Sequence, residues 1–382
     1  MKPRILFSYV SIGSGHQQAA KAIEKYIKTR DPDIATLCVN SFSFSGFVAT
    51  NIVSFIYFYT IKLAPELWGY LYDNTWVKKK INIFYSLINW GNSIRFYSLI
   101  KRFNPSVIVC TQAIPCGIVA GLKRRKKINI PLVAIMTDFV AHIYWIYKEV
   151  DIYFVATEDM KMKLMEHGID ENRIKLSGIP VAQDFAMSNN KQEILRKEKL
   201  SDKIKTILLM GGSRGIGKLK EVISELDKID IPYQVIAVAG NNKKLKKKLD
   251  LIKVNQGNQL KVYGFAEHLN ELMDISDLII TKPGGLTSAE VLIKGLPMVI
   301  VNPIPGQEEY NSRFLVKNGT AVRVDNINEL GSTVKMLFKD PEKLLQMKQS
   351  ALKLAKPTAT SDIGNIIIEL GGKYADRSLH TT

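Results

Sequence analysis

Residues that could bind a diphosphate and a sugar are concentrated between Thr281 and Asn311. An apolar run, Leu278 to Ile280, predicts a buried strand, Pro283-Gly284-Gly285 ends it, and helical periodicity then runs from Thr287 to Lys294. The free amides and the dipole of a helix start bind anions, and glycines let a phosphate approach the backbone closely. We therefore expect a diphosphate site at this turn.

Side chains near this turn could bind the rest of a nucleotide sugar. Glu290, one turn into the predicted helix, can accept hydrogen bonds from vicinal hydroxyls such as those of a ribose. A second strand, Met298 to Val301, is followed by Gly306-Gln307-Glu308-Glu309-Tyr310-Asn311, which we expect to form a loop at the same edge of the sheet. Its amide and carboxylate groups suit sugar hydroxyls.

A candidate general base lies near the N-terminus. The run Ile5 to Val10 predicts a first buried strand, and Gly13-Ser14-Gly15-His16 leads from it into a helix. Position 18 is Gln, so the loop is not a GxGxxG dinucleotide motif. The positive end of the helix dipole disfavours an imidazolium, so a neutral His16 could accept a proton. The alternative is a histidine that only caps the helix or contacts a phosphate.

The remaining chain alternates short apolar strands with helical stretches, which predicts parallel sheets covered on both faces. The further predicted strands are Val107 to Cys110, Leu132 to Met136, Ile152 to Ala156, Thr206 to Met210, Tyr233 to Ala239 and Leu260 to Phe265. We expect a first domain over residues 1–185, a polar and charged linker over 186–203, and a second domain over 204–355. A last helix is predicted over Ser361 to Leu370, and Gly371 to Thr382 is predicted to be a frayed tail.

Composition narrows the class of protein. A length of 382 residues favours two domains, and ordinary apolar, glycine and proline contents exclude a fibrous or disordered chain. The net charge of +17 favours anionic partners: nucleic acid, acidic substrates or an anionic membrane surface. Three cysteines without metal-binding spacing indicate a reducing compartment, and no signal-peptide core forms after the first strand. We expect a cytoplasmic protein.

A charge-free stretch from Ile34 to Ile61 could contact a membrane. In a helical projection a polar stripe is formed by Ser43, Thr50, Asn51, Ser54 and Tyr57, which favours an interfacial or partly buried amphipathic segment over a spanning one. Aromatic residues continue from Trp68 to Trp76 and are followed by Lys78-Lys79-Lys80, a composition suited to lipid headgroups. We expect peripheral binding to the inner face of the cell membrane; the alternative is an aromatic core hairpin.

The segment 281–311 resembles the nucleotide-sugar signature of a glycosyltransferase family. That family, of the glycosyltransferase family 28 type, includes the bacterial lipid II-forming GlcNAc transferase, plastid galactolipid synthases and bacterial diacylglycerol glucosyltransferases. The resemblance covers nearly the whole chain and implies an α/β GT-B fold, with two Rossmann-like domains facing a cleft. It implies that Glu290 holds the uridine ribose, and that the donor sugar and phosphates are bound by Gln307, Glu308, Asn311, Gly285, Leu286 and Thr287.

Other motifs extend the resemblance. Gly15 and His16 match the family's GxGH turn, Gly212 and Ser213 its phosphate-side GGSxG loop, and Phe265 ends the segment that pairs with uracil. The run Thr137-Asp138-Phe139, with His142 and Trp145, resembles the acceptor-side TDFxxHxxW element. A metal site at Asp138 and His142 is disfavoured because no third ligand is near in sequence. The resemblance also implies that the C-terminal segment, residues 356–382, crosses back to the first domain.

The implied reaction is inverting transfer of glucose or galactose from a UDP-sugar to diacylglycerol, which gives a β-glycosyldiacylglycerol, with His16 as the base. The implied partners are UDP-glucose or UDP-galactose, diacylglycerol and anionic membrane lipids, without nucleic acid, metal or another cofactor. The sequence Asp31-Pro32-Asp33 is formally a DxD, but it follows a helix and is predicted to be a turn. The alternatives are a polyprenyl-linked acceptor, a UDP-GlcNAc 2-epimerase, and a UDP-sugar-binding protein without turnover.

Overall fold

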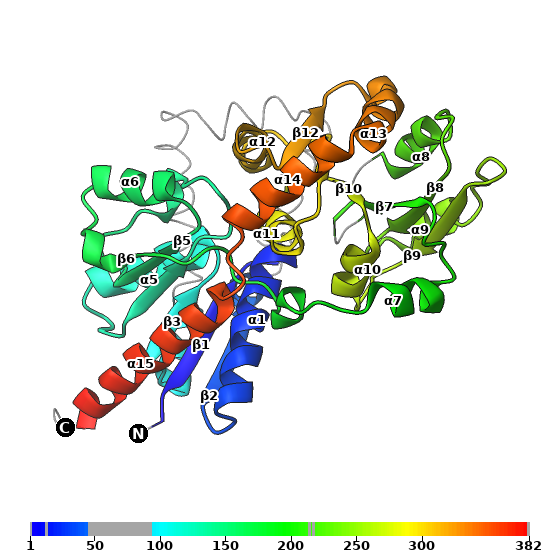
Figure 1. Ribbon diagram of the computed structural model, residues 1–382. Coiled ribbons are helices and arrows are strands. Elements are labelled where there is room, and N and C mark those ends of the chain that lie inside the picture. The colour runs from blue at the N-terminus through cyan, green and yellow to red at the C-terminus, as the bar shows by residue number, and fades with distance from the viewer. Residues whose placement is uncertain (1, 12–13, 45–93, 213–214, 216–217, 380–382) are drawn as a thin grey trace. The chain divides into compact units, whose positions relative to one another are not determined.

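The computed structural model describes residues 2–11, 14–44, 94–212, 215 and 218–379, and the chain divides into two compact units. Unit 1 comprises Met1–Gln183, Pro305–Gln307 and Thr358–Thr382, and unit 2 comprises Asp184–Ile304 and Glu308–Pro357. The described part of each unit contains a six-stranded parallel sheet with helices beside it (Figure 1).

The sheet of unit 1 has the strand order β2-β1-β3-β4-β5-β6. Its strands are β1 (Arg4–Tyr9), β2 (Ala35–Asn40), β3 (Val107–Cys110), β4 (Leu132–Ile135), β5 (Ile152–Val155) and β6 (Ile174–Leu176). The chain leaves β1 toward β2 on one side and returns to β3 on the other, so the direction of winding reverses between β1 and β3. In open α/β sheets ligands bind at such a reversal, beyond the carboxyl ends of the strands.

Helices cover both faces of this sheet. Alternate residues of β1 enter different cores: Ile5 and Phe7 pack with α1 (Ser14–Arg30) and α15 (Ala359–Leu379), and Leu6 packs with α5 (Ala113–Arg124). Figure 1 shows α15 lying along α1, and Gly364 allows this approach, because a Cβ there would lie 2.5 Å from the ring of Tyr26. The remaining helical segments of unit 1 are residues 94–103, α6 (Glu158–Glu166), η1 (Ser41–Phe44), η2 (Ile143–Trp145) and η3 (Glu171–Arg173), with η4 (Gln183–Ala186) at the unit boundary.

The sheet of unit 2 has the strand order β12-β11-β10-β7-β8-β9. Its strands are β7 (Lys205–Met210), β8 (Tyr233–Val238), β9 (Gln259–Tyr263), β10 (Leu278–Thr281), β11 (Met298–Val301) and β12 (Ala321–Val324). The winding reverses between β7 and β10, which pair in parallel. The glycine-rich segments that follow these two strands therefore flank the reversal point of unit 2.

The helices of unit 2 also lie on both sides of their sheet. Leucine, isoleucine and valine residues of α8 (Leu219–Leu226) and α13 (Leu330–Lys339) share one core with the strands. Elsewhere in the unit α7 contacts α10 and α11 contacts α14. The remaining bounds are α7 (Lys191–Glu198), α9 (Lys243–Leu249), α10 (Leu269–Ile275), α11 (Gly285–Lys294), α12 (Gln307–Lys317), α14 (Pro341–Leu354) and η5 (Ile327–Glu329).

The structure differs from the sequence-based prediction in two segments of the chain. The predicted linker 186–203 contains helix α7, which Asn190 caps and which belongs to unit 2 because Ile194 and Leu195 are buried there. The predicted tail after residue 370 continues as α15 to Leu379. Gly371 and Ala375 are buried, so this part of the helix packs against unit 1 instead of fraying.

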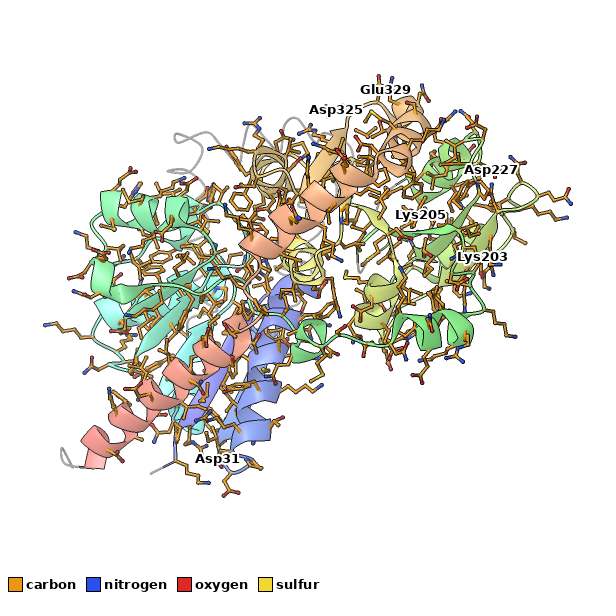
Figure 2. The ribbon with its side chains drawn as sticks, in the orientation of Figure 1. Asp31, Lys203, Lys205, Asp227, Asp325 and Glu329 are labelled. Atoms are coloured by element: carbon orange, nitrogen blue, oxygen red, sulfur yellow. The ribbon has the colours of Figure 1, made fainter. Side chains whose placement is uncertain are left out.

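The predicted turn at Asp31-Pro32-Asp33 is confirmed. It lies between α1 and β2, at the amino ends of the strands, and Figure 2 shows Asp31 there. Lys2 forms ion pairs of 2.7 Å with both aspartates, which accounts for them as parts of a surface turn.

Residues 45–61 of the predicted membrane-contacting stretch Ile34 to Ile61, and the aromatic residues up to the lysines at 78–80, lie outside the described residues, whereas the first part of the stretch forms β2 and η1. Within the described ranges no helix has the length and apolar character that crossing a bilayer requires. The interfacial role of the stretch stays a prediction.

Candidate active site

His16 of unit 1 is held at both its ring and its backbone. It lies with Gly15 in the first turn of α1, and its Nδ1 is 2.8 Å from the hydroxyl of Thr137. The hydroxyl of Thr111 donates to the His16 carbonyl at 2.8 Å. Thr111 follows β3 and Thr137 follows β4, so neighbouring strands β1, β3 and β4 bring the three residues to the carboxyl edge of the sheet, beside its reversal point.

Burial controls the charge of this histidine. Desolvation lowers the pKa of His16, whereas the charge of Asp138 and a hydrogen bond with the backbone of Thr111 act to raise it, and the lowering effect prevails. The imidazole is therefore mainly neutral at pH 7. From the sequence we expected the helix dipole to keep the imidazole neutral, whereas in the structure the main cause is burial of the ring.

The predicted acceptor-side residues lie in the loop after β4. Asp138 follows Thr137 directly, and His142 caps η2, with its Nδ1 accepting from the Tyr144 amide at 3.4 Å. Trp145 does not line a surface: it is 4% exposed and packs in the hydrophobic core of unit 1. The indole therefore supports the loop from beneath, and the acceptor-side role of Trp145 stays a prediction.

In unit 2, α11 begins without a side-chain cap. Its N-cap is Gly284, and among the described residues no side chain accepts from its first amides. A Cβ at Gly284 would meet nothing within 4 Å, so the space beside the turn is open. Leu286 and Thr287 of the first turn are partly buried. The helix starts two residues earlier than predicted, at Gly285, and presents unbonded amides of the kind that bind anions.

The turn after β7 depends on glycine. Gly212 has a φ of +71° and Gly215 a φ of +57°, and the Gly215 amide donates to the Gly212 carbonyl at 2.9 Å. A Cβ at Gly215 would lie 2.3 Å from the carbonyl oxygen of Ala239, so no other residue fits there without a backbone shift. Ser213, the predicted phosphate-side residue, lies outside the described residues.

Glu290 of α11 is a buried acid. It is 9% exposed, and burial, reinforced by the charge of Asp184, raises its pKa to about 8. In the protein without ligand the predicted ribose acceptor is therefore a neutral carboxylic acid at pH 7, not a carboxylate. Asp184 Oδ1 and Ser288 Oγ are also buried, and neither has a hydrogen-bond partner among the described residues. Such unsatisfied groups are rare in protein interiors unless a ligand or water completes them.

The stretch Gln307 to Asn311 forms the first turns of α12 instead of the expected loop. Gly306, with a φ of +93°, turns the chain, and Glu308 and Glu309 then stabilise a helix N-terminus. Glu308 Oε2 accepts from the Ile304 amide at 2.8 Å. Asn311 is buried and donates to the Pro283 carbonyl at 3.1 Å, so it braces the glycine turn before α11.

Phe265 follows β9 and is 52% exposed, so its ring is open to a ligand. No three His, Cys, Asp or Glu side chains come together as a metal-binding group in the portions of the chain that the structure describes. The expectation that no metal or cofactor is needed stays a prediction.

Sequence reasoning missed three polar residues around these turns. Thr111 and Lys282 each follow a strand directly, and that position is the signal that could have identified them. Asp184 carries no such signal, because it lies at the unit boundary and approaches Glu290 only through the fold.

Comparisons with known proteins agree with this arrangement. The family model for monogalactosyldiacylglycerol (MGDG) synthase matches residues 16–181, and that for the glycosyltransferase family 28 C-terminal domain matches residues 206–363. The chain is 32% identical to the processive diacylglycerol beta-glucosyltransferase of Bacillus cytotoxicus, over 96% of this chain and 94% of that protein. A protein of the same name from Bacillus subtilis is 32% identical over 91% of this chain and 90% of its own length.

Solved structures establish the fold. MurG of Acinetobacter baumannii superimposes with a TM-score of 0.62 at 15% identity, over 96% of this chain and 99% of that one. A UDP-GlcNAc 2-epimerase from Neisseria meningitidis, solved with UDP-GlcNAc, gives a TM-score of 0.59 at 14% identity, over 96% of this chain and 100% of that one. These likenesses confirm the predicted GT-B fold class. The chain itself belongs to the glycosyltransferase family of the monogalactosyldiacylglycerol synthases and processive diacylglycerol beta-glucosyltransferases.

Proposed function

We propose that this protein transfers a hexose, glucose or galactose, from a UDP-sugar to the free hydroxyl of diacylglycerol. The observation that carries the proposal is the 32% identity, over nearly the full length of both chains, to a processive diacylglycerol beta-glucosyltransferase. The geometry of each unit supports it, since unit 1 places a neutral histidine at its reversal point and unit 2 places glycine turns at its own.

His16 acts as the base. In the tautomer that this role requires, Nδ1–H donates to the Thr137 hydroxyl, 2.8 Å away, and Nε2 carries the lone pair for the acceptor hydroxyl. As the hydroxyl oxygen bonds to the anomeric carbon, its proton moves to Nε2. The charge of Asp138, which raises the pKa of His16, stabilises the imidazolium that results.

Unit 2 holds the donor. The bond from the anomeric carbon to the β-phosphate oxygen breaks, and the negative charge on the leaving UDP is stabilised by the amides of Gly285, Leu286 and Thr287. One displacement on an α-linked donor inverts the anomeric centre and gives a β-linked product. Glu290 holds the ribose hydroxyls, and the glycine turn after β7, with Gly212 and Ser213, lies on the phosphate side.

Two further parts of the donor site follow from the same assignment. The segment that ends at Phe265 receives the uracil, and Gln307 and Glu308 at the start of α12 read the sugar. Both roles rest on family membership and on the position of each residue after a strand of unit 2.

Basic surfaces support action at an anionic membrane. Residues 124–127, at the end of α5, are all exposed arginines and lysines, and Lys243, Lys244, Lys247 and Lys248 are exposed on α9. Each Lys or Arg near an anionic surface contributes about 1 kcal/mol to binding. We infer peripheral binding to the inner face of the cell membrane.

A transfer assay tests the proposed function. Purified full-length protein is incubated with radiolabelled UDP-glucose, UDP-galactose or UDP-GlcNAc and with vesicles that contain dioleoylglycerol and an anionic phospholipid. We expect label from one of the two hexose donors in the lipid phase, in a product that a β-glycosidase releases. Conversion of UDP-GlcNAc to its 2-epimer without lipid labelling, or labelling only when a polyprenyl-linked acceptor is supplied, would refute the proposal.

A further inference from the structure

Three residues converge where neighbouring strands of unit 2 end. Strands β11, β10 and β7 lie side by side, and the residues that follow them directly are Asn302, Lys282 and Gly211. All three line one small cavity, which Lys218 also lines. Lys282 therefore lies between the glycine turn after β7 and the one before α11.

The buried ammonium group of Lys282 has few interactions that offset the loss of its hydration. Its side chain is only 12% exposed, and its nearest acidic partner, Glu308 Oε2, lies 3.9 Å from Nζ, too far for a hydrogen bond. Within the described ranges no acceptor lies within hydrogen-bond distance of this amine. Burial lowers the pKa of Lys282, with Glu308 acting against it. A buried charge without close partners is costly, unless an anion completes the site.

The neighbours of Lys282 are arranged for such an anion. Glu308 Oε2 already accepts from the Ile304 amide, so it is partly occupied. The α11 turn, two residues on from Lys282, has amides without a side-chain cap. Asn302, on the other side, holds a φ of +46°, a strained conformation for a residue other than glycine, and such strain is concentrated at functional sites.

We infer that Lys282 is a further donor-binding residue, whose ammonium contacts the diphosphate of the nucleotide between the two glycine turns. The inference rests on the proposed function, because it assigns a ligand group within the same site. Lys282 neutralises the charge that the diphosphate carries and that increases as the sugar leaves. Glu308, 3.9 Å away, is its distant counterion.

A ligand series distinguishes this role from a purely structural one. Titration calorimetry measures binding of UDP and of uridine to wild type and to Lys282→Met, which replaces the charge with an apolar chain of similar length. We expect the affinity for UDP to fall about 10- to 100-fold, as for loss of a hydrogen bond to a charged group. The affinity for uridine, which has no phosphate, should change by less than about twofold.

Lys294→Met is the matched control. Lys294 is another buried lysine of unit 2, on α11, but its amine has structural partners: Asp274 at 2.8 Å and the Met187 carbonyl at 2.7 Å. Its loss should leave the ratio of UDP to uridine affinity unchanged. Lys282→Arg keeps the charge and should recover part of the UDP affinity. Lys282→Gln serves in place of the Met variant if that variant does not fold.

The outcomes separate the inference from the proposed function. Equal losses of UDP and uridine affinity in the Lys282 variants, or no loss of either, would overturn the role of Lys282 and leave the proposed function intact. Wild-type protein that binds no UDP would refute the proposed function itself.

Discussion

Glu290→Gln tests whether unit 2 maintains a buried acid for its ligand. The carboxyl is 9% exposed, and its pKa is raised to about 8 from an ordinary value of 4.5. Between these two values the folded protein keeps a proton that the unfolded chain has lost. Stability from this group is therefore fully present below pH 4.5 and is lost as the pH rises toward 8.

The size of the effect follows from the width of that window. The free energy of unfolding should fall by about 1.4 kcal/mol per pH unit through it, and by roughly 5 kcal/mol in total. Glutamine at the same position has no proton to lose. The difference in stability between Glu290→Gln and wild type should therefore shift in favour of the variant as the pH rises, whatever constant cost the buried amide adds.

The assay is urea denaturation of wild type and variant at intervals between pH 5 and 8.5. Glu342→Gln is the control, since Glu342 is exposed on α14 and its substitution should change stability by less than about 0.5 kcal/mol at any pH. The Glu290 carboxyl accepts from the ribose hydroxyls, and an amide NH₂ in place of one of its oxygens cannot accept, so the same variant should bind UDP about tenfold more weakly. A stability difference that does not vary with pH would refute the reasoning about Glu290.

Three further predictions follow. Gly215→Ala should lower the free energy of unfolding by about 1–3 kcal/mol in urea denaturation, because φ of Gly215 is +57° and a Cβ there would meet a carbonyl oxygen. Gly121→Ala, in open space on α5, should be neutral or stabilising. Equal effects of the two substitutions would contradict the requirement for glycine at position 215. Truncation after Leu370 should lower the melting temperature, because it removes the part of α15 in which Gly371 and Ala375 are buried. An unchanged melting temperature would show that this segment is a tail. The rate of transfer should fall on acidification with a midpoint below pH 6.5, because the pKa of His16 is lowered. Asp138→Asn should shift this midpoint to a still lower pH. A midpoint above pH 6.5 would contradict the neutral imidazole.

The parts of the fold that the sequence predicts are those with a local signal. Central strands such as Val107 to Cys110 are continuous apolar runs, since a parallel sheet buries both their faces. The edge strand β2 is only partly buried at every position and the edge strand β12 at two of its four, so their mixed composition conceals them. Helix α7 was taken for a linker because only a few of its residues are buried.

The glycine turns could be placed from sequence because turn chemistry is local, whereas the charge states could not. Helix α11 begins two residues before its predicted start. The neutral state of Glu290 depends on burial and on Asp184, which lies far away in sequence. The hydrogen bonds of Thr111 and Thr137 with His16 likewise join residues that are far apart in sequence. The sequence predicts a loop at the start of α12 because its polar residues are compatible with either structure. In the structure Gly306 turns the chain directly before the helix begins.

The central claim is that unit 1 supplies the base while unit 2 binds the donor nucleotide. One measurement tests it directly: UDP affinity and the rate of transfer to diacylglycerol, determined on the same samples of wild type, His16→Ala and His167→Ala. His167 is an exposed histidine at the end of α6, so its variant should match wild type in both. His16→Ala should keep its UDP affinity within about twofold and lose transfer by roughly 10²- to 10⁴-fold. A parallel loss of UDP affinity in His16→Ala, or transfer at the wild-type rate, would contradict the account.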